Sequence, residues 1–257
     1  MAKILAITNQ KGGVGKTTTG VNLAASLAAA KQRVLLVDLD PQGNATMGSG
    51  IDKRGLTAMV YHVLLGVRGL AEVRTRSANG EYDLIPANRE LAGAEVEMVD
   101  IERRETRLRE ALAPVEGNYD YVLIDCPPAL NLLTVNGLTA AHAVMIPMQC
   151  EYYALEGLSD LVATIKKVRL HLNPGLQIEG LLRTMYDSRN TLAQQVSAQL
   201  IEHFGDKVYR TVIPRNVRLA EAPSFGVPAL KFDKNSKGAQ AYLALAGEML
   251  NRNAQVA

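Results

Sequence analysis

Cysteine is scarce in this chain, which carries only Cys126 and Cys150 among its 257 residues. Neither belongs to a paired-cysteine motif, which argues against a disulfide framework and makes a reducing cytosol the simplest setting. No apolar run approaches ~18 residues, so the sequence predicts no segment that spans a membrane. The first residues lead directly into a strand pattern, and we therefore expect no signal peptide.

A large excess of charge of one sign is also missing. The chain has 28 Lys and Arg against 26 Asp and Glu, and its net charge of +2 by itself predicts no polyanionic partner. The charges are unevenly placed, because residues 166–218 contain nine basic and four acidic side chains, a net charge of +5. Such asymmetry is typical of a surface that faces nucleic acid, although a set of solvated helix faces gives the same pattern.

A glycine-rich run at residues 8–18, TNQKGGVGKTT, is the most informative feature that the chain does contain. Its end, GKT, matches the phosphate-loop pattern G-x-x-x-x-G-K-[ST], but Gln10 stands where that pattern has its first glycine. Two glycines instead follow a second lysine, Lys11. One lysine already serves the nucleotide in the ordinary pattern, so Lys11 needs a separate explanation.

Each part of this run suits phosphate binding. Gly12 and Gly13 let backbone N–H groups turn inward as an anion nest, and the helix that begins near Lys16 adds the positive end of its dipole. Lys16 can reach the β- and γ-phosphates, and the Thr17 hydroxyl can ligate Mg²⁺. The alternative is a glycine-rich turn with two lysines that face solvent.

Strand and helix patterns alternate along the chain. A strand at 3–8 precedes the loop and a helix at 17–30 follows it, which is the order that a phosphate loop demands. Further strands are expected at 33–38, 121–125, 143–147 and 178–182, with weaker candidates at 82–86 and 208–213. Helices are expected near 57–65, 90–113, 132–141, 156–172, 191–204 and 238–252.

This alternation predicts an α/β fold, a doubly wound, mostly parallel sheet with helices on both faces, and the length fits one large domain. Residues 48–80 contain the runs GSG, GVRG and SANG and are expected to form a surface excursion. Ligands in this architecture lie beyond the carboxyl ends of the strands. The loop and the strand ends at Asp38 and Asp125 are therefore expected to face one site.

Carboxylates follow or end two of the expected strands. Asp125 closes the strand in YDYVLIDCPP, a Walker B arrangement, where a carboxylate beside the loop can hold Mg²⁺ directly or through its water. Asp38 ends the strand in VDLDPQGNAT, and direct metal contact and support of a neighbouring ligand are equally open for it. Asp40, on the following loop, can orient the attacking water, with a turn-capping role as the alternative.

The segments KGGVGKTT, VDLDPQGNAT, YDYVLIDCPP, LLRTMYDSRNTL and VIPRNVRLAEAPSFG together resemble the ParA/Soj chromosome-partitioning ATPases over essentially all of residues 3–250. The loop alone would indicate only the wider deviant Walker A group, which includes MinD, nitrogenase iron proteins and arsenical pump ATPases. The two later segments narrow the resemblance to the ParA branch. It implies the deviant Walker A P-loop NTPase fold, with residues 1–257 as a single P-loop ATPase domain.

The resemblance also implies roles for individual residues. Lys11 matches a signature lysine that reaches the partner subunit's phosphates across an ATP-bound dimer, much as an arginine finger does. Gly12 matches the glycine at the close contact between subunits, and Asp40 matches the catalytic aspartate. Arg189 and Arg218 match arginines implicated in non-specific DNA binding.

Besides the two DNA-binding arginines, the implied site residues fall into three groups. Catalysis is expected to involve Lys11, Lys16 and Asp40. The nucleotide is expected to contact Lys11, Gly12, Gly13, Val14, Gly15, Lys16, Thr17 and Thr18, with Pro214 and Asn216 at the adenine. The metal is expected to lie at Thr17, Asp40 and Asp125.

The implied cycle is a switch that uses ATP and Mg²⁺ as cofactors. Two ATP-bound monomers close as a homodimer that binds DNA non-specifically, without reading bases. Slow hydrolysis, accelerated by the basic N-terminal segment of a ParB-type centromere-binding protein, then releases the DNA. We therefore expect a cytoplasmic, nucleoid-associated protein with no membrane partner.

Three alternatives have their own sequence requirements. A MinD-like membrane switch needs a C-terminal amphipathic helix with basic flanks, whereas the last 20 residues carry one cation, Arg252, and no Trp or Phe. An iron–sulfur reductase subunit needs cysteine ligands, and Cys126, just beyond the Walker B strand, is awkwardly placed for a cluster at a dimer axis. A metabolic P-loop ligase needs a second substrate pocket, which nothing in the sequence suggests. The cargo, whether chromosome, plasmid or protein assembly, is not distinguished by the sequence.

Overall fold

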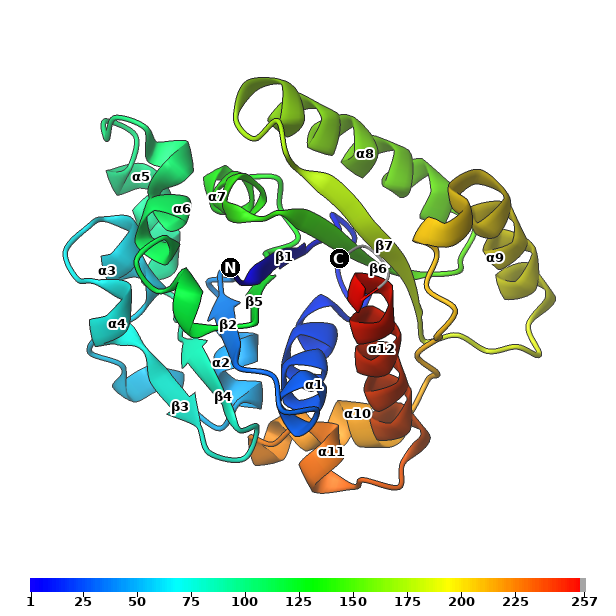
Figure 1. Ribbon diagram of the computed structural model, residues 1–257. Helices are drawn as coiled ribbons and strands as arrows, with labels where there is room; N and C mark the ends of the chain where they lie inside the picture. The colour runs from blue at the N-terminus through cyan, green and yellow to red at the C-terminus, as the bar shows by residue number, and fades with distance from the viewer. Residues whose placement is uncertain (255–257) are drawn as a thin grey trace.

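A seven-stranded sheet in the order β3-β4-β2-β5-β1-β6-β7 forms the centre of the structure, a computed structural model that describes residues 1–254 (Figure 1). Neighbouring strands are parallel except β3 and β4, which are antiparallel. This confirms the predicted α/β fold with a mostly parallel sheet. The strands are β1 (Lys3–Ile7), β2 (Val34–Asp38), β3 (Thr75–Ser77), β4 (Tyr82–Ile85), β5 (Tyr121–Asp125), β6 (Ala143–Gln149) and β7 (Gln177–Thr184).

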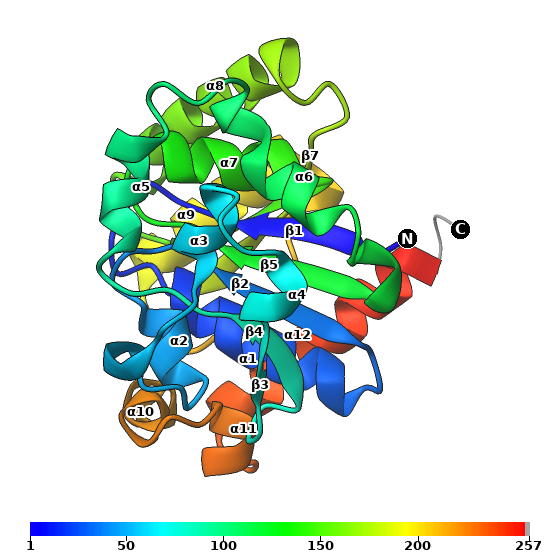
Figure 2. The same ribbon diagram turned by 90° about the vertical axis from the view of Figure 1, so that its left-hand side faces the viewer.

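Helices cover both faces of this sheet (Figures 1 and 2). One face packs against α1 (Lys16–Ala29), α2 (Asn44–Gly48), α10 (Val217–Glu221), α11 (Ala229–Phe232) and α12 (Lys237–Ala254). The other packs against α3 (Val60–Leu64), α4 (Leu70–Val73), α5 (Leu91–Glu97), α6 (Arg107–Leu112), α7 (Leu132–Ala140), α8 (Ala154–His171) and α9 (Thr191–Phe204). Short 3₁₀ turns span Lys53–Gly55, Arg104–Thr106, Glu116–Asn118, Gly205–Lys207 and Ala222–Phe225. Within residues 1–254, no helix is both long enough and apolar enough to cross a membrane.

The central strands feed two separate cores. Ile4 and Ala6 of β1 pack on the α7 side, whereas Leu5 and Ile7 pack on the α1 side. Successive side chains of a strand point to opposite faces, so a sheet covered on both sides needs continuous apolar runs. That requirement explains why continuous apolar runs in the sequence predicted these strands.

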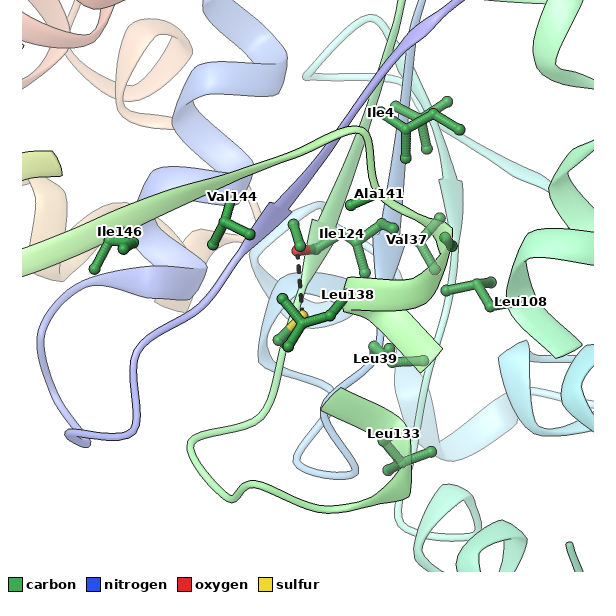
Figure 3. Close-up of a cluster of buried hydrophobic side chains, with 14 of the residues drawn as sticks. Ile4, Val37, Leu39, Leu108, Ile124, Leu133, Leu138, Ala141, Val144 and Ile146 are labelled. Atoms are coloured by element: carbon green, nitrogen blue, oxygen red, sulfur yellow. Dashed lines mark hydrogen bonds between the residues drawn. The ribbon is translucent and has the colours of Figure 1, made fainter. Parts of the chain in front are cut away.

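Helix α7 forms much of the first core. Figure 3 shows Leu133 and Leu138 of this helix gathered with Ile124 of β5 and Val144 of β6. All four side chains are buried. This packing holds α7, and the loop that leads into it from β5, against the middle of the sheet.

The strand register aligns three chain segments at the carboxyl edge of the sheet. Asp125 at the end of β5 lies opposite Ile7 at the end of β1 and opposite Asp38 at the end of β2. The phosphate loop leaves β1 directly after Ile7. The prediction that this loop and the two carboxylates share one edge is therefore confirmed.

Residues 208–213 do not form the strand that their sequence suggested. The segment makes a single bridge to β7, and the amides of Arg210 and Thr211 donate instead to the carboxylate oxygens of Glu248, each at 2.8 Å. A carboxylate from α12 therefore takes the donors that a strand ladder would have used.

Two other segment predictions were wrong. Residues 48–80 are not a surface excursion, because Val60 of α3 and Leu70 of α4 are buried in the core. The expected helix at 90–113 is divided into α5 and α6, with Arg103 between them in a left-handed conformation at φ +58°. That backbone conformation cannot continue a right-handed helix.

Candidate nucleotide and magnesium site

The phosphate loop joins the carboxyl end of β1 to the first residue of α1. Gly13 and Gly15 have φ values of +75° and +86°, in the left-handed region that residues with a Cβ avoid. Gly12 is exposed, and a Cβ built on it meets no atom within 4 Å. Two glycines therefore shape the loop, whereas Gly12 leaves open space in front of it.

Neighbouring strands hold both halves of the loop. Asn9 Nδ2 donates to the Pro147 carbonyl of β6 at 2.8 Å, and the Thr184 hydroxyl of β7 donates to the Val14 carbonyl at 2.8 Å. Val14 itself is buried. Asn9 and Thr184 were not identified from the sequence, because only the strand order brings β6 and β7 beside the loop.

Lys16, the first residue of α1, holds its positive charge inside the loop. The side chain is buried, and Nζ donates to the Lys11 carbonyl at 3.0 Å. Burial lowers the pKa of Lys16, while the nearby carboxylates of Asp125 and Asp40 act in the opposite direction. The ammonium therefore lies close to Asp40 and Asp125, two of the three carboxylates that the sequence singled out.

The N-terminus of α1 is open to an anion. No side chain caps this helix, and its first turn contains no acidic residue. The first amides of an α-helix lack intrahelical partners, so those near Thr17 and Thr18 can donate to phosphate oxygens. The loop, Lys16 and the helix end thus form one cradle of positive potential.

Asp125 is the clearest indication that this site suits a cation. The side chain is fully buried, and neither carboxylate oxygen has a hydrogen-bond partner within residues 1–254. Burial and the Asp38 carboxylate raise the pKa of Asp125 well above its ordinary value, and the nearby Thr17 hydroxyl, outside hydrogen-bond geometry, partly offsets this. A buried carboxylate without partners is unfavourable, so a cation at Asp125 and Thr17 would stabilise the site.

These oxygens fit Mg²⁺ better than other metals. Across residues 1–254, no three His, Cys, Asp or Glu side chains cluster as a metal site on their own. Mg²⁺ usually keeps water and phosphate oxygens around one or two protein ligands, as a phosphate loop beside Asp125 allows. Cys126 and Cys150 are buried, and burial raises the pKa of both thiols, which disfavours the thiolate form that iron–sulfur clusters need.

Asp38 supports the neighbouring loop through both of its oxygens. Oδ2 accepts from the Thr46 amide at 2.8 Å and the Thr46 hydroxyl at 2.7 Å, and Oδ1 accepts from the Asp40 amide at 3.2 Å. Burial, chiefly, raises the pKa of Asp38 to about 6, and the hydrogen bonds from Thr46 counter it. Asp38 therefore positions the 40–46 loop. This role depends on its contact with Thr46, a residue that the sequence analysis did not single out.

Asp40 caps its turn with one carboxylate oxygen, and its expected role toward the attacking water stays a prediction. Oδ1 accepts from the Gln42 amide at 2.9 Å, so the side chain does cap its turn. Oδ2 makes no hydrogen bond to any residue between 1 and 254, and the side chain lies near Lys16 and Asp125. One oxygen thus orders the loop while the other can receive a proton or a water.

The predicted adenine contacts lie at the same edge of the sheet. Pro214 bridges to Tyr186, just beyond the end of β7, and both Pro214 and Asn216 are partly exposed. The Asn216 side chain caps α10 by accepting from the Arg218 amide at 3.1 Å. These two residues are therefore positioned by β7 and α10, and their contact with a base stays a prediction.

Both predicted DNA-binding arginines are exposed and paired with carboxylates of this chain. Arg189 pairs with Asp187 at 2.8 Å, and Arg218 pairs with Glu221 at 2.8 Å and with Asp233 at 3.4 Å. The hydrogen bonds from Arg189 lower the pKa of Asp187 to about 2. Phosphate contact by either arginine therefore competes with a carboxylate.

One member of the basic segment is structural. Arg183 is buried and donates to the Ser197 hydroxyl at 2.8 Å and the Tyr209 carbonyl at 2.7 Å. The sequence count of nine basic residues therefore overstates the charge available at the surface. Burial of a guanidinium at β7 could not be read from charge spacing.

Comparison with known proteins identifies close relatives of this chain. A family model described as an AAA domain matches residues 2–178. The sporulation initiation inhibitor protein Soj of Bacillus subtilis is 56% identical over 249 residues, covering 97% of this chain and 98% of Soj. The chromosome partitioning protein ParA of Caulobacter vibrioides is 53% identical over 252 residues, covering 97% of this chain and 94% of ParA.

A solved structure extends the similarity to the fold. Cobyrinic acid a,c-diamide synthase of Mycobacterium smegmatis, crystallised with an ATP analogue and magnesium, is 41% identical and has a TM-score of 0.85. The superposition covers 97% of this chain and 95% of that one. The same sheet and helix arrangement therefore holds a nucleotide and magnesium in a relative.

Proposed function

This chain belongs to the ParA/Soj family of chromosome-partitioning ATPases, and we propose that ATP closes two copies of it into a dimer that binds DNA without sequence preference. The observation that carries this proposal is the different placement of the two loop lysines. Lys16 is buried within its own loop, whereas the Lys11 side chain is 45% exposed and pairs with Glu151, outside the loop. A second lysine outside its own phosphate cradle suits the phosphates of a partner subunit, where negative charge develops during hydrolysis.

ATP and Mg²⁺ are the cofactors of this ATPase, and we assign their contacts to the cradle described above. Lys16 and the first amides of α1 would bind the phosphates, and Thr17, Asp40 and Asp125 would hold Mg²⁺ directly or through water. Bound Mg²⁺ neutralises charge on the phosphate oxygens. Asp40 would accept a proton from the attacking water through its free oxygen.

The rest of the site follows from the same arrangement. Pro214 and Asn216 would contact the adenine, and Gly12 would lie at the contact between the two subunits. We also infer a single P-loop ATPase domain, because both cores of residues 1–254 share one sheet; the last three residues of the expected range 1–257 lie outside the described residues. The partners would be DNA, a second copy of this chain and a ParB-type protein, and the protein would act in the cytoplasm at the nucleoid.

Arg189 and Arg218 would supply the DNA contacts. In a dimer each arginine occurs twice, so four guanidinium groups can exchange their carboxylate partners for phosphates of the duplex. Phosphate contacts are not base-specific and weaken with salt, which suits a reversible hold on any DNA. Loss of the γ-phosphate would remove the link between the subunits and release the DNA.

DNA retention by the wild type with ATP or ADP tests the switch. We expect retention with ATP only, loss of retention in Lys11→Ala and Arg218→Glu, and intact nucleotide binding in Arg218→Glu. Asp40→Ala is expected to give a stable, DNA-bound dimer that does not turn over ATP. Equal retention with ADP would refute the switch, and normal turnover by Asp40→Ala would refute its catalytic role.

Arg54 provides a matched control for the arginine assignment. It forms the same local pair with Asp52 that Arg189 forms with Asp187, two residues apart in each case, and the two arginine side chains are 84% and 88% exposed. Each phosphate that a protein neutralises adds about one to the slope of log affinity against log salt. Arg189→Ala is therefore expected to make that slope shallower by about one for each arginine that contacts a phosphate, whereas Arg54→Ala leaves it unchanged. Equal effects of both variants would refute the assignment.

The membrane and metabolic alternatives are separable from this proposal. Leu245 and Met249 of α12 are buried in the core shared with α1, so the apolar face of that helix is occupied in the monomer. A MinD-like switch would float with anionic liposomes in ATP, whereas we expect no flotation. A metabolic synthase would need a small substrate for ATP turnover. We instead expect DNA and a ParB-type partner to stimulate ATP hydrolysis with no small substrate present.

A further inference from the structure

The Lys11 side chain is held within its own subunit. Its Nζ lies 2.5 Å from the Glu151 carboxylate, its amide donates to Asn9 Oδ1 at 3.0 Å, and its carbonyl accepts from Lys16 Nζ at 3.0 Å. The backbone and the side chain of Lys11 therefore both contact groups of their own subunit. The only charged partner of the Lys11 side chain within residues 1–254 is Glu151, 140 residues away in the chain.

Strand β6 and the residues just after it contact the phosphate loop at two points. Glu151 stands two residues beyond the end of β6 and donates its amide to the Gln149 carbonyl at 3.0 Å. The same strand accepts a hydrogen bond from Asn9 at the Pro147 carbonyl. The Pro147 carbonyl thus holds Asn9 at the start of the phosphate loop, and Glu151, just beyond β6, holds Lys11.

The ion pair is accessible and can open. The side chains of Lys11 and Glu151 are 45% and 51% exposed, so water can replace either partner at small cost. An ATP phosphate group presented by a second copy carries more negative charge than one carboxylate. Such a group would therefore take Lys11 from Glu151 when the two subunits approach.

We propose that Glu151 is a positioning residue that holds Lys11 in its own subunit until a second, ATP-bound copy displaces it. This inference rests on the proposed function, in which Lys11 acts on the partner subunit's phosphates. Each dimer that forms must open two of these pairs. Glu151 therefore opposes dimer formation and makes assembly depend on ATP in both subunits.

The size of the effect follows from the exposure of the pair. An exposed ion pair changes an equilibrium by about 1.4-fold to 5-fold. Opening two pairs per dimer multiplies the effect, so removing Glu151 is expected to lower the dimer dissociation constant by about 2-fold to 30-fold. Salt screens an exposed pair, so the difference from wild type should shrink as salt rises from about 0.05 M to about 0.5 M.

Sedimentation velocity with a non-hydrolysable ATP analogue and Mg²⁺ provides the test. The variants are Glu151→Gln, the charge-conserving Glu151→Asp, and the matched control Glu156→Gln. Glu156 is exposed, lies five residues further along, and makes no side-chain hydrogen bond or ion pair within residues 1–254. We expect a lower dissociation constant for Glu151→Gln that converges on wild type at high salt, an intermediate value for Glu151→Asp, and the wild-type value for Glu156→Gln.

The possible failures are distinguishable. If wild type dimerises with the analogue and Glu151→Gln has the same or a higher dissociation constant at low salt, the positioning role is overturned and the proposed function stands. A salt-independent gain, or an equal gain in Glu156→Gln, also overturns it, because general charge or structural effects would then explain the result. If wild type forms no nucleotide-dependent dimer, the proposed function fails and this inference fails with it. Thermal unfolding of each variant verifies that the compared proteins are folded.

Discussion

The Thr46 hydroxyl is expected to stabilise both the fold and the loop that carries Asp40. Thr46 lies in α2 and is fully buried. Its hydroxyl donates to Asp38 Oδ2 at 2.7 Å and accepts from the Ala87 amide at 2.9 Å. Thr46→Val keeps the shape of the side chain but removes both interactions at once.

The magnitude follows from those two contacts. Loss of a hydrogen bond to a charged group costs about 1.5–3 kcal/mol, and an unpaired buried amide at Ala87 costs about 1–3 kcal/mol more. Burial of the added methyl group returns roughly 0.8 kcal/mol. We therefore expect Thr46→Val to lower the free energy of unfolding by about 2–5 kcal/mol.

Thr139→Val is the matched control for this prediction. Thr139 in α7 is also buried, but its hydroxyl has no hydrogen-bond partner within residues 1–254. Removing an unpaired buried hydroxyl should leave the free energy of unfolding unchanged or raise it, by less than about 1 kcal/mol. The two variants thus make the same chemical change at equal burial and differ only in hydrogen bonding.

Urea unfolding of nucleotide-free protein, followed by far-ultraviolet circular dichroism, measures both variants. ATP turnover of Thr46→Val should fall more than its ATP affinity, because Asp38 positions the Asp40 loop, whereas we propose that Lys16 and the N-terminus of α1 bind the phosphates. Equal unfolding free energies for Thr46→Val and wild type would refute the reasoning, as would equal losses in the two variants.

Three further changes test other parts of the site. Asp125→Asn removes a buried, unpaired carboxylate, so unfolding of the nucleotide-free protein in EDTA should need the same or more denaturant. Its Mg²⁺-dependent ATP turnover should fall about tenfold or more. A large loss of stability would show that Asp125 is satisfied without a cation. Gly15→Ala should lower the free energy of unfolding by about 1–2 kcal/mol, because Gly15 has φ +86°. Gly12→Ala should change that free energy by less than about 0.5 kcal/mol and impair only the ATP-dependent dimer. Equal stabilities of the two variants would contradict this expectation. Saturating ATP at about 100 times its Kd should stabilise wild type by about 2.7 kcal/mol, and removal of Mg²⁺ should reduce that gain in wild type but little in Asp125→Asn, as thermal unfolding can measure.

The sequence alone predicted most of the elements that position the site. Continuous apolar runs ending in Asp38 and Asp125 identified β2 and β5, because strands buried on both faces cannot carry polar residues before their ends. The glycines and Lys16 identified the loop and the start of α1. Local chemistry was sufficient in each case, since a strand, a tight turn and a helix start have their own residue preferences.

Segments whose structure depends on distant partners were not predictable in this way. Residues 208–213 have the composition of a strand, but Glu248 of α12 takes two of their amides. Val60 and Leu70 lie in a stretch that is rich in turn residues, yet the sheet edge offers them a core. No local pattern encodes which remote group a donor or an apolar side chain will meet.

The same division holds for function. The order of glycine and lysine in residues 8–18 by itself predicted a nucleotide-binding loop and a second lysine that the ordinary phosphate-loop pattern does not explain. Only the tertiary structure decided that Asp38 serves Thr46 and the 40–46 loop, that Asp125 has no partner within residues 1–254, and that Lys11 pairs with Glu151. The physical reason is that a residue's type is local, whereas its charge environment and its partners come from strand order, which places β2, β5, β1 and β6 side by side.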